Sequence, residues 1–160
     1  CATAKTTLGG FLSRLYRCPL FHMDDFYLPP ERKTAQRLAE PGGNVDAERF
    51  FTDVLSPLSR GETVHYRPYH CHSNALGEEI AVPPAPLAVV EGVYSLRPEL
   101  QPYYHVKCFL DVPWSTRRAR LLARNGPEGL ERFEKLWIPL EDAYFRAFPI
   151  RECCDVILQG

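Results

Sequence analysis

The chain contains 160 residues, enough for a single domain that buries a sizeable core. Its hydrophobic content of 45% and charged content of 24% are typical of a soluble globular protein, and its net charge of -1 offers no cationic surface for nucleic acid or an anionic membrane. No apolar run approaches the ~18 residues of a membrane span, and no signal peptide is recognisable. We therefore expect neither nucleic acid nor a membrane among its partners.

The first segment places Ala4-Lys5-Thr6-Thr7 directly before residues 6–16, whose apolar residues have the spacing of an amphipathic helix. A lysine and a hydroxyl at a helix start are typical of the second half of a phosphate-binding loop, G-x-x-x-x-G-K-[ST]. Lys5 would then reach phosphate groups, and the Thr6 hydroxyl would hold Mg²⁺. An ordinary helix start with a threonine cap is the alternative.

Residues 18–23 form a short apolar run that predicts a buried strand, followed by Asp24 and Asp25 and closed by Pro29-Pro30. Open parallel sheets collect their ligand-binding groups at the carboxyl ends of their strands. A carboxylate there can accept a proton or hold a metal ion, whereas an Asx turn before the prolines is the alternative.

The middle of the chain contains three further segments. Residues 31–45 are polar and broken by glycine, which predicts a surface excursion. Residues 47–58 have helical spacing, and residues 64–73 predict either irregular structure or one arm of a hairpin.

Residues 86–94 form the clearest buried strand, which ends in Glu91-Gly92. An acid after such a strand is costly to desolvate unless it binds a cation or accepts hydrogen bonds, so the pattern favours a metal-binding role. Further strands are predicted at 105–113 and 154–160. Strands that alternate with helices indicate an α/β fold, with a parallel sheet covered on both faces.

The remaining helices are predicted at 114–123 and at 130–148, the second interrupted by Pro139. The first is rich in arginine, and guanidinium groups match phosphate oxygens, although a solvated helix face explains most of such a cluster. The cluster consists of Arg117, Arg118, Arg120 and Arg124.

The six cysteines show no C-x-x-C spacing, and two of them are adjacent. This usage predicts reduced thiols in a cytoplasmic protein rather than a disulfide framework. The run His70-Cys71-His72 does not predict zinc, because three adjacent side chains cannot easily converge on one ion.

Together these segments resemble the uridine kinase family of P-loop kinases, whose relatives include nicotinamide riboside kinase and phosphoribulokinase. The resemblance is strongest to a bacterial branch labelled uridine kinase-like, and it covers nearly the whole chain. HMDDFYLPP is similar to the family's Q-D-[DS]-F-Y, and VVEGVY to its E-G-[IV]. The other matching segments follow in the family's order: AKTT, GGNVDAERF, RPYHCHS, the arginine-rich region after FLDVP, and CDVILQG.

The resemblance implies a P-loop NTPase-type doubly wound fold, mostly parallel with helices on both faces. It implies one kinase domain over residues 1–160, with a lid at about 114–130. It also implies catalytic roles for Asp24 as base, Lys5 and Arg124. The implied phosphate-binding residues are Ala4, Lys5, Thr6, Thr7, Arg117 and Arg120; the implied substrate-binding residues are Tyr27, Asp46, Tyr69 and His72; the implied metal-side residues are Thr6, Asp24 and Glu91.

The implied reaction is ATP-dependent, Mg²⁺-assisted phosphoryl transfer to a small-molecule hydroxyl, most closely a nucleoside 5′-hydroxyl. Nicotinamide riboside or another sugar-like alcohol is the alternative acceptor, and a nucleotide-binding protein without catalysis is the alternative class. Ala4 stands where the loop has glycine, and Asn125 where an aspartate often follows the lid arginine. Tyr69 and His72 are also closer together than in nucleoside kinases, so the resemblance implies a kinase more firmly than it implies uridine.

In this family a strand in the middle of the sheet precedes the phosphate loop. We therefore expect an apolar strand and the first half of the loop before Cys1, because its neighbours would otherwise keep unpaired backbone groups. In the completed loop Ala4 is the single departure, and we expect its backbone at positive φ. The sequence leaves the oligomeric state open, a homo-oligomer included.

Overall fold

The computed structural model describes residues 1–160, which form helices and short strands. The helices are α1 (Lys5–Tyr16), α2 (Ala35–Ala39), α3 (Ala47–Phe50), α4 (Ser56–Arg60), α5 (Trp114–Arg132) and α6 (Ile138–Ala147). The strands are β1 (Leu20–His22), β2 (Val64–Tyr66), β3 (Tyr69–His70), β4 (Ala75–Leu76), β5 (Ile80–Val82), β6 (Val89–Glu91), β7 (Cys108–Asp111) and β8 (Val156–Gln159). No helix combines the length and the apolar character that a membrane span needs.

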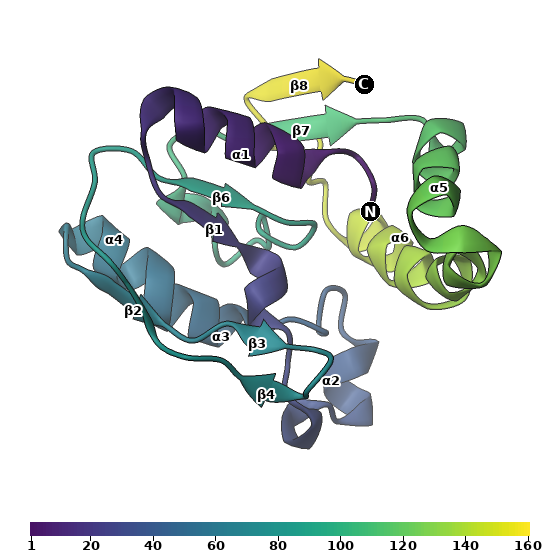
Figure 1. Ribbon diagram of the computed structural model, residues 1–160, viewed down its shortest axis with the longest axis horizontal. Helices are drawn as coiled ribbons and strands as arrows, with labels where there is room; N and C mark the ends of the chain where they lie inside the picture. The colour runs from purple at the N-terminus through teal and green to yellow at the C-terminus, as the bar shows by residue number, and fades with distance from the viewer.

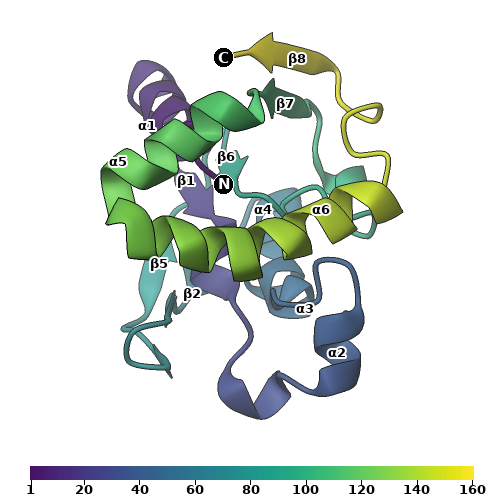
Figure 2. The same cartoon turned by 90° about the vertical axis from the view of Figure 1, so that its right-hand side faces the viewer.

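The four strands predicted to be parallel form two parallel pairs. β1 pairs with β6, with Leu20 opposite Val89, and β7 pairs with β8, with Cys108 opposite Val156. Both views place the strands in the order β1, β6, β7, β8 (Figures 1 and 2), and no strand joins β6 to β7. The parallel pairing is confirmed. The single continuous sheet is not observed, and the further strand expected before Cys1 stays a prediction.

The remaining four strands form two antiparallel pairs. β2 pairs with β5, and β3 pairs with β4 across a tight turn (Figure 1). The segment 64–73 is therefore a hairpin arm, one of the two predicted alternatives. The segment 31–45 is only partly the expected surface excursion, because Gly42–Asp46 is buried and Asp46 accepts a hydrogen bond from the backbone N–H of Arg49 at the start of α3.

The predicted helices exist, but their interiors differ from the prediction. Residues 47–60 run as one helical segment with a π-helical stretch at Phe51–Leu55 between α3 and α4. α5 extends nine residues beyond the expected end and bends at Gly126. The chain stays helical through Pro139, which lies in the first turn of α6 directly after a π-helical stretch at Phe133–Trp137.

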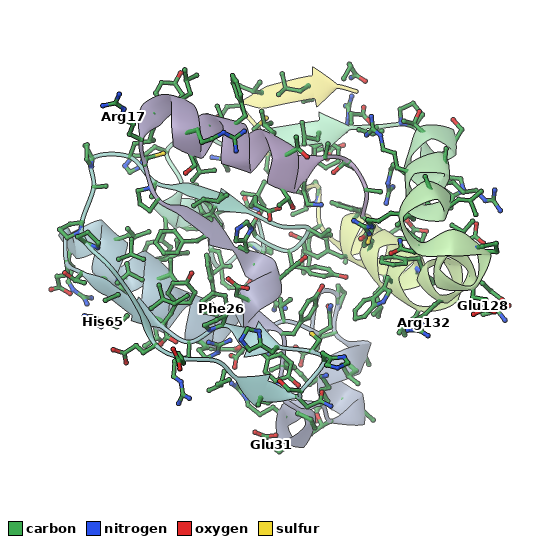
Figure 3. The ribbon with its side chains drawn as sticks, in the orientation of Figure 1. Arg17, Phe26, Glu31, His65, Glu128 and Arg132 are labelled. Carbon is green, nitrogen blue, oxygen red and sulfur yellow. The ribbon has the colours of Figure 1, made fainter.

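The core lies where β1, β2 and β6 meet the segment α3–α4. Its largest fully buried side chains include Phe21, Met23, Phe26 and Phe50. Phe26 points inward and packs edge-on against Phe50, with ring centroids 4.9 Å apart, whereas Glu31 and Arg132 extend outward (Figure 3). This packing fixes the turn after β1, which carries Asp24.

We predict that Gly92→Ala destabilises the protein by at least about 2 kcal/mol. Gly92 follows β6 with φ +149°, which side chains rarely adopt, and an added Cβ would overlap the Cβ of Met23. Equilibrium unfolding in urea measures the loss.

Gly61→Ala is the matched control, because Gly61 also has positive φ (+68°) but no atom within 4 Å of an added Cβ. It should cost about 1 kcal/mol or less. Equal losses in the two variants would contradict the predicted clash with Met23.

Candidate functional site

The segment that begins α1 has the backbone shape of an anion-binding loop. Ala4 precedes the helix with φ 69° and ψ 23°, and Ala2 has φ 56°. Positive φ at Ala4 is the conformation expected from the loop pattern, and it costs a non-glycine residue about 1–2 kcal/mol. Left-handed residues of this kind turn successive N–H groups toward one concave side, and the positive end of the α1 dipole adds to the attraction for anions.

The Glu91 side chain, at the end of β6, contacts both the start of α1 and the end of β1. Its Oε1 accepts a hydrogen bond from the Thr6 hydroxyl of α1 at 3.0 Å and contacts Nδ1 of His22, the last residue of β1, at 2.6 Å. Burial acts to raise the pKa of Glu91, but the bonds from His22 and Thr6 outweigh it, so the pKa is lowered. The bond to Glu91 also raises the pKa of His22. Glu91 is therefore held as an anion.

Asp24 lies in the turn that follows β1, beside the end of β6. Tyr27, three positions along the chain, donates its hydroxyl to Asp24 Oδ1 at 3.4 Å. The Asp24 side chain is exposed to solvent, yet the surrounding protein partly desolvates its carboxyl group. This desolvation, followed by the charge of Glu91, raises the pKa of Asp24, and Lys5 only partly opposes the shift. Asp24 is thus a more basic carboxylate than an isolated one.

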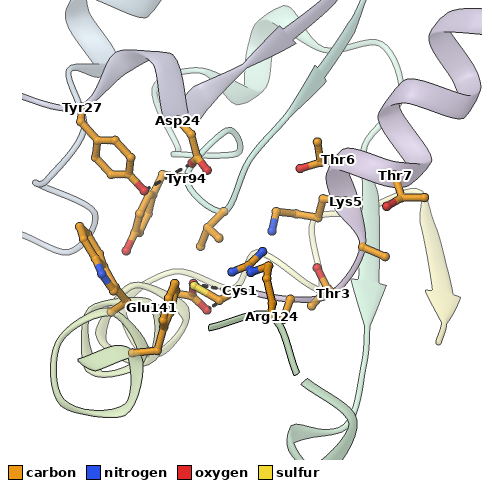
Figure 4. A pocket seen from close by; sticks show the side chains of 15 residues that line it. Cys1, Thr3, Lys5, Thr6, Thr7, Asp24, Tyr27, Tyr94, Arg124 and Glu141 are labelled. Carbon is orange, nitrogen blue, oxygen red and sulfur yellow. Dashed lines mark hydrogen bonds and ion pairs between the residues drawn. The ribbon is translucent and has the colours of Figure 1, made fainter. Parts of the chain in front are cut away.

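A cavity of about 350 Å³ brings most of the predicted site residues together. Figure 4 shows Lys5 and Arg124 pointing into the same space, with Asp24 and Thr6 beside it. The predicted residues that line it are Ala4, Lys5, Thr6, Thr7, Asp24, Tyr27 and Arg124. Two cations, a carboxylate and a loop with left-handed residues can hold an anion and remove a proton close to it.

The lid arginines divide into two groups. Arg124 lines the cavity and lies over the Phe133 ring at 5.7 Å. Arg117 instead donates to Glu141 at 2.8 Å, and Arg120 donates to the backbone oxygen of Ala2 at 3.3 Å. Neither lines the cavity. In this structure the side chains of these two arginines, which were expected to bind phosphate, instead connect α5 to α6 and to the loop before α1.

A second cavity of about 480 Å³ lies on the other side of Tyr27, which lines both. Asp46 and Tyr69 line it as expected. The Asp46 carboxylate is almost completely buried and already paired with Arg32, a partner the sequence analysis missed. His72 lies in the exposed turn between β3 and β4 and lines neither cavity, so the structure does not bring it to the site.

Among the further lining residues of the first cavity, four with large side chains were not anticipated: Tyr94, Phe133, Trp137 and Glu141. Tyr94 is the last residue of the VVEGVY segment, and this position was the only sequence feature that could have indicated a role for it in the site. Phe133 and Trp137 are the ends of a π-helical stretch, which helical periodicity does not predict. Glu141 is buried among apolar residues of α6 and paired with Arg117.

The oxygen atoms near Lys5 suit a hard cation such as Mg²⁺. No group of three or more His, Cys, Asp or Glu side chains forms a complete metal site. Mg²⁺ needs few protein ligands, however, because it keeps waters and uses phosphate oxygens. Thr6, Asp24 and Glu91 offer a hydroxyl and two carboxylates, and Glu91 Oε2 accepts no hydrogen bond from the protein. The donor set therefore fits an ion that arrives with phosphate.

Comparisons with known proteins agree with the fold. No protein-family model matches the chain, and no curated protein matches it. Among solved structures, the chain is similar to one described as a possible uridine kinase from Bacillus stearothermophilus. The two share 19% sequence identity and a TM-score of 0.73, over 98% of this chain and 82% of that one. This similarity establishes a shared fold.

We predict that the His22–Glu91 pair stabilises the fold in a defined pH window. Because the folded pKa of His22 is raised, its contribution is complete below about pH 6.5, the unfolded value, and is lost as the pH rises through the folded pKa. The contribution of Glu91, whose pKa is lowered, is present above about pH 4.3 and is lost as the pH falls through its folded pKa. Urea unfolding of the parent and His22→Gln from pH 4 to pH 9 measures the difference.

The matched control is His65→Gln, which removes an exposed histidine that faces Glu79. It should leave the pH dependence unchanged, since exposed pairs contribute little. A stability difference for His22→Gln that does not shrink toward pH 9 would contradict the prediction.

Proposed function

We propose that the protein transfers the γ-phosphoryl group of ATP to a hydroxyl of a small molecule. The observation that carries this proposal is the convergence of Lys5, Asp24 and Arg124 on one cavity at the N-terminus of α1. The structural neighbour described as a possible uridine kinase supports the same class.

In the proposed reaction, the acceptor hydroxyl lies beside Asp24 and the γ-phosphate beside the loop. A bond forms between the acceptor oxygen and the γ-phosphorus while the bond from that phosphorus to the β–γ bridging oxygen breaks. Asp24 takes the proton from the acceptor, and the products are ADP and a phosphate monoester. Lys5 and Arg124 offset the negative charge on the transferring group and the leaving oxygen.

Thr6, Asp24 and Glu91 would hold Mg²⁺ together with phosphate oxygens. The ion would supply charge neutralisation across the β- and γ-phosphates. The Glu91 bonds to Thr6 and His22 keep this edge anionic before any ligand arrives.

For the acceptor we propose a nucleoside that presents its 5′-hydroxyl. The second cavity shares Tyr27 with the first and provides Asp46 and Tyr69, which suit a polar sugar. Nicotinamide riboside or another sugar-like alcohol would meet the same groups. ATP consumption measured across a panel of such acceptors tests the class and identifies the substrate.

A nucleotide-binding protein without catalysis is the second candidate, favoured by the left-handed Ala4. Retention of Asp24, whose pKa is raised, and of Glu91, which is held as an anion, favours the enzyme. A protein that only binds nucleotide has little use for these two carboxylates together with the arginines.

We predict that Asp24→Asn lowers the rate of phosphoryl transfer by about 10²–10⁴-fold, because a general base contributes that much. ATP affinity should change far less. Single-turnover rates and ATP titrations measure the two effects separately.

Asp25→Asn is the control, because the neighbouring carboxyl also has a raised pKa but does not line the cavity. It should retain near-parental turnover. Near-parental turnover of Asp24→Asn would exclude Asp24 as the base.

We predict that Ala4→Gly tightens ATP binding about tenfold. The change removes the ~1–2 kcal/mol strain of a left-handed alanine, so the loop adopts its anion-binding shape more readily. Isothermal titration of ATP measures the gain, and unchanged affinity would show that the alanine is harmless.

A further inference from the structure

We propose that Trp137 binds the planar ring of the acceptor by stacking, as a specificity-determining residue of the first cavity. This inference rests on the proposed function. Aromatic side chains from three segments line this cavity. We call the set Tyr27, Tyr94, Phe133 and Trp137 the aromatic wall.

The local structure turns two of these rings toward the cavity. Phe133 and Trp137 are the first and last residues of the π-helical stretch between α5 and α6. Such stretches are rare, weaken regular helical hydrogen bonding and are frequent at functional sites. The bend at Gly126 lets the helical chain turn back over the site (Figure 2), so that Arg124 and Phe133 meet at 5.7 Å.

Trp137 is connected to the proposed base through one neighbour. Its ring centroid lies 5.8 Å from that of Tyr27, with the planes at 50°. The Tyr27 hydroxyl in turn contacts Asp24 at 3.4 Å. A flat ring stacked on Trp137 would therefore lie on the acceptor side of the cavity, with its substituents toward Asp24.

The aromatic residues expected to flank the ring are placed less favourably. Tyr69 donates its hydroxyl to Asn74 at 3.0 Å, and its own ring faces Lys33 at 5.8 Å. His72 lines neither cavity. Glu141, which lines the same cavity, is paired with Arg117 at 2.8 Å. Base–aromatic stacking is tolerant of ring identity, so the wall suits a pyrimidine, a purine or a pyridine ring.

Kinetics test the proposal with three variants. Trp137→Leu should raise the acceptor KM by about ten- to a hundredfold, as expected for the loss of one stacked base, and change the ATP KM little. Trp137→Phe should restore most of the affinity. Trp114→Leu is the matched control, because Trp114 begins α5, faces Arg117 and lies outside the cavity.

Tryptophan fluorescence provides a readout that needs no turnover. The chain has only two tryptophans, so Trp114→Phe reports Trp137 alone and Trp137→Phe reports Trp114 alone. Uridine should quench Trp114→Phe and leave Trp137→Phe unchanged. Ribose, which has the hydroxyls but no planar ring, should quench neither.

The outcomes separate the two proposals. Phosphoryl transfer that survives Trp137→Leu with an unchanged acceptor KM overturns the role of Trp137 and leaves the kinase intact. Quenching of Trp114→Phe by ATP but not by any acceptor nucleoside also overturns it, because the wall would then bind adenine. Quenching by a nucleoside without transfer to any acceptor supports the ring site and overturns the kinase.

Discussion

The Glu91 carboxylate is the constraint on which the site depends. A single oxygen of this side chain contacts Thr6 at the start of α1 and His22 at the end of β1, while its backbone ends β6. A carboxylate in this position would be costly to bury without such partners, and hydrogen bonds to a charged group contribute about 1.5–3 kcal/mol each. The same interaction therefore stabilises the strand pair and fixes the distance between the loop and the two acidic strand ends.

The cavity separates two kinds of chemistry. Lys5 and Asp24 lie on the loop side, where phosphate charge would be met, whereas Arg124, Phe133 and Trp137 come from α5 and the π-helical stretch that follows it. Tyr27 belongs to both, since its ring contacts Trp137 and its hydroxyl contacts Asp24. This arrangement would place the reacting hydroxyl at the boundary, where the pKa of Asp24 is raised by desolvation.

The sequence predicted the features that depend on local chemistry. The strand ending in Glu91 and the acid after β1 each followed from a residue whose type suits few other environments, whereas the left-handed Ala4 followed from the resemblance of its segment to a phosphate-binding loop. Sequence could not predict contacts between distant segments. Arg117 was expected at phosphate but pairs with Glu141, twenty-four positions away, and Asp46 is paired with Arg32. Trp137 was missed because its place depends on a π-helical stretch, which an apolar pattern of period 3.6 conceals.

Gly126 gives the region over the cavity a pivot. Its backbone angles, φ 71° and ψ 179°, are accessible to glycine but strained for other residues. No atom lies within 4 Å of the position that an added Cβ would take, so neighbouring side chains do not hold this residue in place. Arg124 precedes the pivot, whereas Phe133 and Trp137 follow it. A rotation about this one residue would therefore move Phe133 and Trp137 relative to Arg124 without the unfolding of the helical segments on either side.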